Sequence, residues 1–349
     1  MTSSNLRVGV IGAGKIGAHH ARILARLPGV ELVGVCDVNL WRAQLAAWRA
    51  GAVAYRNHDD LLKQVDAAVI AVPTHLHLEV GRAAMEAGVH CLIEKPIAAS
   101  LDEARALLDL SEQKKLVLQV GHVERFNPAV LEAIRHIRHP RFITVERLGP
   151  WDPRVAQIGV VLDLMIHDLD ILLTLVDSEV ESLEAIGASL LSKHEDIANV
   201  RVRFANGCVA DLTASRISLS RARKARIFQE DSYLSIDYLN GTLKVYRKKN
   251  AVIKDLLKDV EMLTPKLDKT EPLRNEHNHF LECIRHNRKP WPSGEHGLEA
   301  LKLALQITEE LERYELSEHK RAPSFMPSWA QGLTSLAKSA TRSVLGGDL

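Results

Sequence analysis

The chain has 349 residues, a length that suggests two domains and an ample core. Charged residues make up 26%, and 45 Lys and Arg nearly balance 44 Asp and Glu, so no overall field favours nucleic acid or an anionic membrane as a partner. No apolar run approaches the length of a membrane span, and the four scattered cysteines include no Cys-x-x-Cys pair. We therefore expect a cytoplasmic protein with reduced thiols and no membrane span.

The first 120 residues alternate between strand and helix signals. Helices are expected at 16–27, near 76–87 and from 101 to about 114, where Ser100 and Glu103 form a capping box. Six strands separated by helices are typical of a doubly wound parallel sheet in an α/β domain. The expected strands are 8–11, 31–36, 52–55, 67–72, 89–93 and 116–120.

A glycine-rich turn follows the first of these strands. It has the G-x-G-x-x-G spacing, which allows a tight turn, a close approach of a pyrophosphate and close packing of the next helix. Asp37 ends the second strand, where a carboxylate can accept the hydroxyls of the adenosine ribose and would repel a 2′-phosphate. Arg42 lies nearby in sequence, so NADP is less favoured than NAD but remains open. The predicted cofactor contacts are Gly12, Gly14, Lys15, Ile16, Gly17 and Asp37.

Polar segments follow the last three strands of the expected sheet. They are Pro73–His77, Glu94–Pro96 and Gly121–Pro128. Ligands of doubly wound sheets bind beyond the carboxyl ends of the strands, at the edge where these segments would lie. Each segment alone could be a solvated turn, but together they favour a functional site at the dinucleotide edge.

The pattern changes after about residue 120. Strand-like runs joined by Asn206-Gly207 and Asn240-Gly241 indicate hairpins and a mostly antiparallel sheet, hence an α+β second domain. We expect a NAD-binding Rossmann domain at 1–121, an α+β domain at 122–317 whose late helices can pack back on the first, and a tail at 318–349. The strands are expected at 142–148, 180–190, 197–205, 208–215, 233–238 and 243–247, and the helices at 273–286, 297–313 and, loosely, 328–343.

One helix candidate, 163–173, is apolar almost all round. Asp163, His167 and Asp170 are spaced i, i+4 and i+7 and would form a narrow polar stripe. The stripe could face water, or it could face an interdomain cleft where Asp163 orients His167 as a general base. A metal site is a third possibility, but no further ligand stands at a recognisable spacing, so none is expected.

These motifs together resemble the Gfo/Idh/MocA family of oxidoreductases. The resemblance rests on Gly12-Ala13-Gly14, Glu94-Lys95-Pro96 and the Asp163-x-x-x-His167 pair, in this order, and covers about residues 5 to 315. It implies a Rossmann domain and a C-terminal α+β domain whose open sheet commonly serves subunit association. We therefore expect a homo-oligomer, a dimer or tetramer, formed through the C-terminal sheet.

The resemblance also implies roles for individual residues. Lys95 would contact the nicotinamide and the reacting hydroxyl, and Asp163 and His167 would be the acid and histidine of the catalytic helix, with either His167 or Lys95 accepting the proton. Where many members carry a glycine-rich run, this chain has Gly159-Val160-Val161-Leu162, so the local substrate contacts differ. The implied cofactor contacts are Pro73, Thr74, His77, Glu94, Lys95 and Arg125, and the implied substrate contacts are Lys95, Arg125, Arg154, Asp163 and His167.

Several stretches are similar to the branch of the family that acts on nucleotide-linked amino sugars such as UDP-N-acetylglucosamine. They include Gly121–Pro128, Gly149–Arg154 and Leu212–Arg216. Arginines would suit the diphosphate of such a substrate, because a guanidinium pairs bidentately with phosphate oxygens. The alternatives are a dehydrogenase of a free polyol or sugar, and a dinucleotide-binding sensor without catalysis. The arginines considered for the diphosphate are Arg125, Arg147, Arg154 and Arg216.

Overall fold

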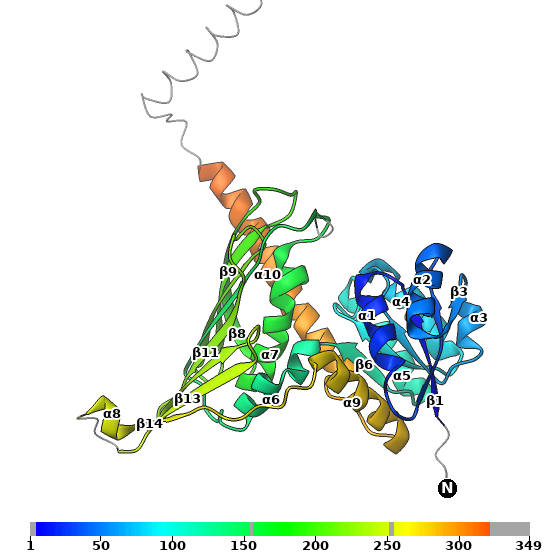
Figure 1. Ribbon diagram of the computed structural model, residues 1–349. Coiled ribbons are helices and arrows are strands. Elements are labelled where there is room, and N and C mark those ends of the chain that lie inside the picture. The colour runs from blue at the N-terminus through cyan, green and yellow to red at the C-terminus, as the bar shows by residue number, and fades with distance from the viewer. Residues whose placement is uncertain (1–4, 154–155, 251–254, 322–349) are drawn as a thin grey trace, which may run out of the picture.

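The computed structural model describes residues 5–153, 156–250 and 255–321. It has two lobes, one around a six-stranded sheet and the other around an eight-stranded sheet (Figure 1). The first sheet is parallel throughout, and its strand order reverses on either side of its central pair, as in a Rossmann fold. The predicted doubly wound sheet is confirmed. In spatial order its strands are β3 (Val53–Tyr55), β2 (Val30–Cys36), β1 (Leu6–Ile11), β4 (Ala67–Ile70), β5 (His90–Glu94) and β6 (Leu118–Gly121).

Three helices of this lobe begin at a capping side chain. The predicted capping box is present: Ser100 Oγ accepts a hydrogen bond from Glu103 N, and the Glu103 carboxylate accepts one from Ala99 N. The side chain of Asn39 caps the second helix in the same way. The helices are α1 (Lys15–Leu24), α2 (Leu40–Ala50), α3 (His58–Leu62), η1 (Thr74–Leu76), α4 (His77–Glu86) and α5 (Leu101–Lys114).

The second sheet is antiparallel except at one central pair of parallel strands, β7 with β10. Gly207 and Gly241 have positive φ in the two predicted hairpin turns. Two strands, β11 and β14, lacked a clear signal in the sequence. In spatial order the strands are β14 (Val260–Leu263), β13 (Thr242–Lys248), β12 (Ser232–Asp237), β11 (Ala222–Phe228), β7 (Phe142–Leu148), β10 (Val209–Ser215), β9 (Ile197–Phe204) and β8 (Val180–Ala188).

Helices cover the face of this sheet that is turned toward the first lobe (Figure 1). The predicted helix at 163–173 begins with a π turn, η4, and only its remainder is α-helical. The long last helix continues to Arg321, past the predicted start of the tail, and the helix expected at 328–343 lies outside the described residues. The helical segments are η2 (Val123–Phe126), α6 (Pro128–Ile134), η4 (Val161–Met165), α7 (Ile166–Val176), α8 (Leu256–Asp259), α9 (Pro272–His286) and α10 (Gly294–Arg321).

The two late helices tie the lobes together. Phe280 and Leu281 of α9 belong to the core on one face of the parallel sheet. Helix α10 contributes Leu301 to the core on the other face, and Leu303 and Ile307 to the core of the second lobe. Each of these buried side chains stabilises the contact by roughly 1.5–3 kcal/mol. These contacts therefore fix the position of one lobe relative to the other. Among the described helices, none is long and apolar enough to cross a membrane.

Candidate active site

The glycine-rich turn after β1 forms a cradle for a phosphate. Gly12 has φ +99°, and a Cβ there would lie 2.4 Å from Ala71 O. A Cβ on Gly17 would lie 1.8 Å from Gly12 O, so this glycine allows α1 to pack against the turn. Gly14, in contrast, has no heavy atom within 4 Å of its Cβ position, which leaves the space that an approaching pyrophosphate needs.

The start of α1 supplies the donors of this cradle. Gly14 is its N-cap and provides no side-chain cap, so the N–H groups of the exposed residues Lys15 and Ile16 are available to an anion. The Asp37 carboxylate accepts hydrogen bonds from Ala13 N and Asn39 N, both at 2.8 Å, which hold it beside the turn. The six residues predicted from the fingerprint thus lie together and fit a dinucleotide.

The turns after β4 and β5 border the same edge of the sheet. His77 is buried, and its two ring nitrogens lie 2.9 Å from Val72 O and 2.8 Å from Pro96 O, so it ties one turn to the other. Pro73 is exposed and Thr74 half-buried, so these two remain open to a cofactor. The Lys95–Pro96 peptide bond is cis.

The predicted catalytic residues meet across the two lobes. Lys95 Nζ, from the end of β5, donates a hydrogen bond to Asp163 O at 2.7 Å and lies 4.0 Å from Asp163 Oδ1. Their side chains are only 17% and 16% exposed. The second lobe therefore brings the π turn against the end of β5. The family resemblance implied that Lys95 and Asp163 would lie close together in this way.

The predicted orientation of His167 by Asp163 is absent. His167 Nδ1 is buried and has no hydrogen-bond partner within the part of the chain that the structure describes. The cause is the π turn: it widens the helix at Val161–Met165, so the i, i+4 spacing of a regular α-helix does not apply there. Asp163 instead faces Lys95.

Burial and neighbouring cations set the protonation of the site. Burial lowers the pKa of His167 well below 6.5, and the charges of Lys95 and Arg147 lower it further. The imidazole is therefore neutral at pH 7. Burial also lowers the pKa of Lys95, although Asp163 and Glu94 oppose this effect. Both shifts favour the neutral form of the group, which is the form that can accept a proton.

Two buried ion pairs fix α7 behind these residues. Arg125 binds Asp170 through two hydrogen bonds of 2.7 Å, and Arg147 binds Asp168 at 2.6 and 2.8 Å. Arg147 also donates to Glu124 at 3.1 Å. The two carboxylates of the predicted stripe, Asp163 and Asp170, therefore pair with protein cations, and so does Asp168, which the stripe did not include.

These pairs bear on the arginines expected to bind a diphosphate. Arg125 and Arg147 are 2% exposed and occupied by carboxylates. Arg216, also 2% exposed, pairs with Asp196 at 2.9 Å. Arg154 lies outside the described residues. The structure does not bring the three described arginines together around an open anion site.

Glu94 joins a buried cluster that the sequence did not reveal. His20 lies between Glu94, at 2.8 Å, and His277, at 2.9 Å. Glu276 is fully buried beside them, and burial together with Glu94 raises its pKa well above 4.5. Ligand atoms of His20, Glu94 and Glu276 lie within 4.8 Å of one another, a grouping of types that metals use. Because its members come from α1, β5 and α9, no spacing in the sequence could predict it.

The end of β6 contributes a further residue that the sequence did not single out. His122 is buried, and its Nε2 lies 3.7 Å from Asp170 Oδ1. Burial lowers its pKa to about 4. The sequence indicated His122 only as a member of the polar segment Gly121–Pro128.

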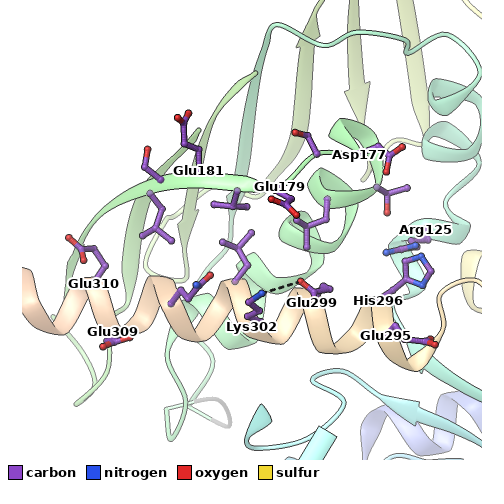
Figure 2. Close-up of a pocket in the computed structure, with 18 of the residues that line it drawn as sticks. Arg125, Asp177, Glu179, Glu181, Glu295, His296, Glu299, Lys302, Glu309 and Glu310 are labelled. Carbon is purple, nitrogen blue, oxygen red and sulfur yellow. Dashed lines mark ion pairs between the residues drawn. The ribbon is translucent and has the colours of Figure 1, made fainter. Parts of the chain in front are cut away.

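A large cavity lies apart from the catalytic residues. It has a volume of about 1370 Å³ and runs between α10 and the segment from α7 to β8. Arg125 and His296 stand at one end, and Glu309 and Glu310 at the other (Figure 2). Seven carboxylates line it against Lys302, Arg313 and Arg125, so its field is negative. Lys95, Asp163 and His167 are not among its lining residues, so it is not the catalytic cleft.

Comparison with known proteins supports the two-lobe organisation. Residues 6–122 match the model of the oxidoreductase family with an NAD-binding Rossmann fold, and residues 134–235 match the GFO/IDH/MocA C-terminal domain. A UDP-N-acetylglucosamine 3-dehydrogenase from Acidithiobacillus ferrooxidans is 38% identical over 315 residues, which cover 89% of this chain and 98% of that protein. The scyllo-inositol 2-dehydrogenase (NAD(+)) of Bacillus subtilis is 26% identical, with 82% of this chain and 88% of that protein covered.

Solved structures give the same picture. The crystal forms of the A. ferrooxidans UDP-N-acetylglucosamine 3-dehydrogenase GnnA superpose with a TM-score of 0.83 at 37% identity, over 89% of this chain and 99% of that one. A levoglucosan dehydrogenase in complex with NADH has a TM-score of 0.81 at 23% identity, over 89% and 98% of the two chains. The latter similarity concerns the fold alone.

Proposed function

Because the chain belongs to the Gfo/Idh/MocA family of oxidoreductases, we propose that it oxidises a secondary hydroxyl of a nucleotide-linked amino sugar, the 3-hydroxyl of UDP-N-acetylglucosamine, with NAD. The observation that carries the proposal is the contact of Lys95 Nζ with Asp163 across the two lobes, beside a neutral His167. A sensor without catalysis would have no need of a lysine and a histidine with lowered pKa values at one cleft.

The choice of substrate rests on the relatives. The A. ferrooxidans protein, whose name states UDP-N-acetylglucosamine, is more similar over nearly its whole length than the B. subtilis inositol dehydrogenase. A free polyol such as myo-inositol is the alternative substrate.

The cofactor would be held by groups already in place. The N–H groups at the start of α1 and the open space at Gly14 suit its pyrophosphate, and Asp37 suits the ribose hydroxyls. The carboxylate of Asp37 would repel a 2′-phosphate, which favours NAD over NADP. When bound, the nicotinamide supplies the acceptor for the hydride that leaves the sugar carbon.

His167 and Lys95 would manage the proton and the charge. His167 accepts the hydroxyl proton, because its neutral imidazole has a free nitrogen lone pair at pH 7. Lys95, positioned by Asp163, places its ammonium beside the oxygen as negative charge develops. Lys95 itself is the alternative proton acceptor, since burial lowers its pKa as well.

We also propose a cytoplasmic homo-oligomer that associates through the uncovered face of the second sheet. Phe228, Tyr233 and Tyr246 form a stacked row on neighbouring strands of this sheet, with ring centroids 4.8 and 5.3 Å apart. Aromatic rows of this kind are common in protein interfaces. All four cysteines are buried and unpaired, as in reduced proteins. Light scattering on the purified protein tests the assembly.

Steady-state rates with UDP-N-acetylglucosamine and with myo-inositol, each with NAD and with NADP, test the proposed function. We expect a higher kcat/KM for the nucleotide sugar and for NAD. A higher kcat/KM for myo-inositol would support the polyol alternative. Tight NAD binding without NADH formation from any sugar would support the sensor.

A further inference from the structure

Arg223 occupies a position at the edge of the catalytic cleft that no motif indicated. It is the second residue of β11 and lies directly opposite Arg147 of β7 in the antiparallel ladder. Residues paired in this way point to the same face of a sheet. Ala225 and Ile227 stand two and four residues after Arg223 and so point to the same face as it does. Both are buried under the helices. The side chain of Arg223 therefore belongs to the helix-covered face, at its cleft end.

The carboxylates near Arg223 are already engaged by another cation. Arg147 holds Asp168 through two short hydrogen bonds and Glu124 through a third. Arg223 Nη1 approaches Glu124 Oε1 only to 3.6 Å, beyond hydrogen-bond distance. Within the described part of the chain its guanidinium has no hydrogen-bond partner, and its side chain is 44% exposed. Arg223 therefore keeps an ion pair with Glu124 but leaves its N–H donors available for hydrogen bonds to a ligand.

The charge of Arg223 reaches the reacting groups. It is one of the cations that lower the pKa values of both Lys95 and His167, which agrees with its position opposite Arg147 in the sheet. This contrasts with Arg125, Arg147 and Arg216, whose guanidinium groups are buried against carboxylates. It contrasts also with the large acidic cavity beside α10, whose field would repel a phosphate (Figure 2).

We infer that Arg223 binds the diphosphate of the nucleotide sugar and so selects nucleotide-linked over free sugars. This inference rests on the proposed function. A guanidinium presents a planar fork of N–H donors that matches two phosphate oxygens at once. Its position beside the catalytic groups, but not in contact with Lys95 or His167, suits a substrate whose charged portion extends away from the hydroxyl that reacts.

The test compares Arg223→Gln and Arg223→Lys with Arg82→Gln. Arg82 is exposed on α4 of the first lobe, so its replacement is a control for the loss of a surface charge that leaves the second sheet unchanged. For Arg223→Gln we expect kcat/KM with UDP-N-acetylglucosamine to fall about 10- to 100-fold, mainly through KM, since hydrogen bonds to charged groups have this size. Arg223→Lys, which keeps the charge without the fork, should lose less.

Binding of product-like ligands separates the possible outcomes. The affinity for UDP, measured by inhibition or calorimetry, should fall in Arg223→Gln by the same factor, while the affinities for uridine and NAD stay unchanged. An unchanged KM and an unchanged UDP affinity in both Arg223 variants would overturn the inference. A wild-type protein that forms no NADH from UDP-N-acetylglucosamine would overturn the proposed function instead. Melting temperatures and the more conservative Arg223→Lys variant guard against a folding defect.

Discussion

The cofactor cradle and the catalytic cleft are built in different ways. In the cradle, one short stretch from β1 to Asp37 provides nearly everything: backbone N–H groups, three glycines and one carboxylate. In the cleft, the end of β5, η2, β7 and η4–α7 each provide between one and three charged side chains, and these neutralise one another in the interior.

This difference has energetic consequences. The cradle depends on space and on exposed donors, so a change at an open position such as Gly14 should affect binding more than folding. The cleft depends on buried ion pairs, and removing one partner of such a pair leaves a charge without compensation. Function and stability are therefore separable in the first region and closely connected in the second.

The largest expected effect comes from His167. Replacing His167 by Asn removes the proton acceptor, so kcat should fall about 10²- to 10⁴-fold. NAD affinity, measured by fluorescence or calorimetry, should stay the same, because no part of the cradle changes. Full activity in His167→Asn would assign the base to another group, with Lys95 first.

Removal of a buried cation should cost the most stability. Arg147→Met removes the cation that donates hydrogen bonds to Asp168 and Glu124, and we expect the free energy of unfolding to fall by about 3–5 kcal/mol. The control is Arg7→Met, which breaks an ion pair with Asp66 whose side chains are 49% and 37% exposed. That change should cost less than about 1 kcal/mol. Equal losses in urea unfolding would contradict the distinction between the two regions.

Two glycines of the cradle, Gly14 and Gly17, are expected to differ in how much an added methyl group lowers the stability. Gly14→Ala adds a methyl group to open space at φ −67°, so the stability should stay near wild type while NAD affinity falls about tenfold, or about 1.4 kcal/mol. Gly17→Ala places a Cβ 1.8 Å from Gly12 O and should lower both stability and NAD affinity. Thermal melts with and without NAD measure both quantities. A Gly14→Ala protein that melts early but binds NAD normally would refute this interpretation of the cradle.

The smallest expected effect is a shift in the pH dependence of kcat/KM, and this shift shows the protonation state of His167 and Lys95 directly. A base with a lowered pKa gains its proton only at lower pH, so the acid limb due to His167 should lie below pH 6.5. Lys95 also has a lowered pKa and loses its proton earlier, so the alkaline limb should lie below pH 10.5. An acid limb above pH 6.5 would mean that nearby carboxylates, rather than burial and cations, dominate at His167.

The same contrast explains what could be predicted from the sequence. Gly12, Gly17 and Asp37 act through local backbone geometry, so their spacing sufficed to predict the cradle and the parallel sheet around it. The juxtaposition of Lys95 with Asp163 followed from family resemblance, since the two residues are far apart in the chain. The partners of Asp168 and Asp170 could not be predicted, because a pattern does not say which arginine reaches which carboxylate in a folded core.

Other misses have similar physical causes. The π turn at Val161–Met165 changes which side chains share a face, and the sequence there has the composition of an ordinary apolar helix. Strand β11 carries two adjacent charged residues, Arg223 and Lys224, so it lacked the alternation of a clear strand. Its pairing with β7 places Arg223 beside the cleft, which only the fold reveals.

The central claim is that this chain moves hydride from the 3-position of a nucleotide sugar while His167 and Lys95 handle the proton. Incubation with NAD and UDP-N-acetylglucosamine deuterated at carbon 3 tests it most directly, with mass spectrometry of both products. We expect deuterium in the reduced cofactor, a 3-keto sugar that has lost it, and both products formed about 10²- to 10⁴-fold more slowly with His167→Asn. Formation of NADH without deuterium would place the oxidation at another carbon and contradict the claim.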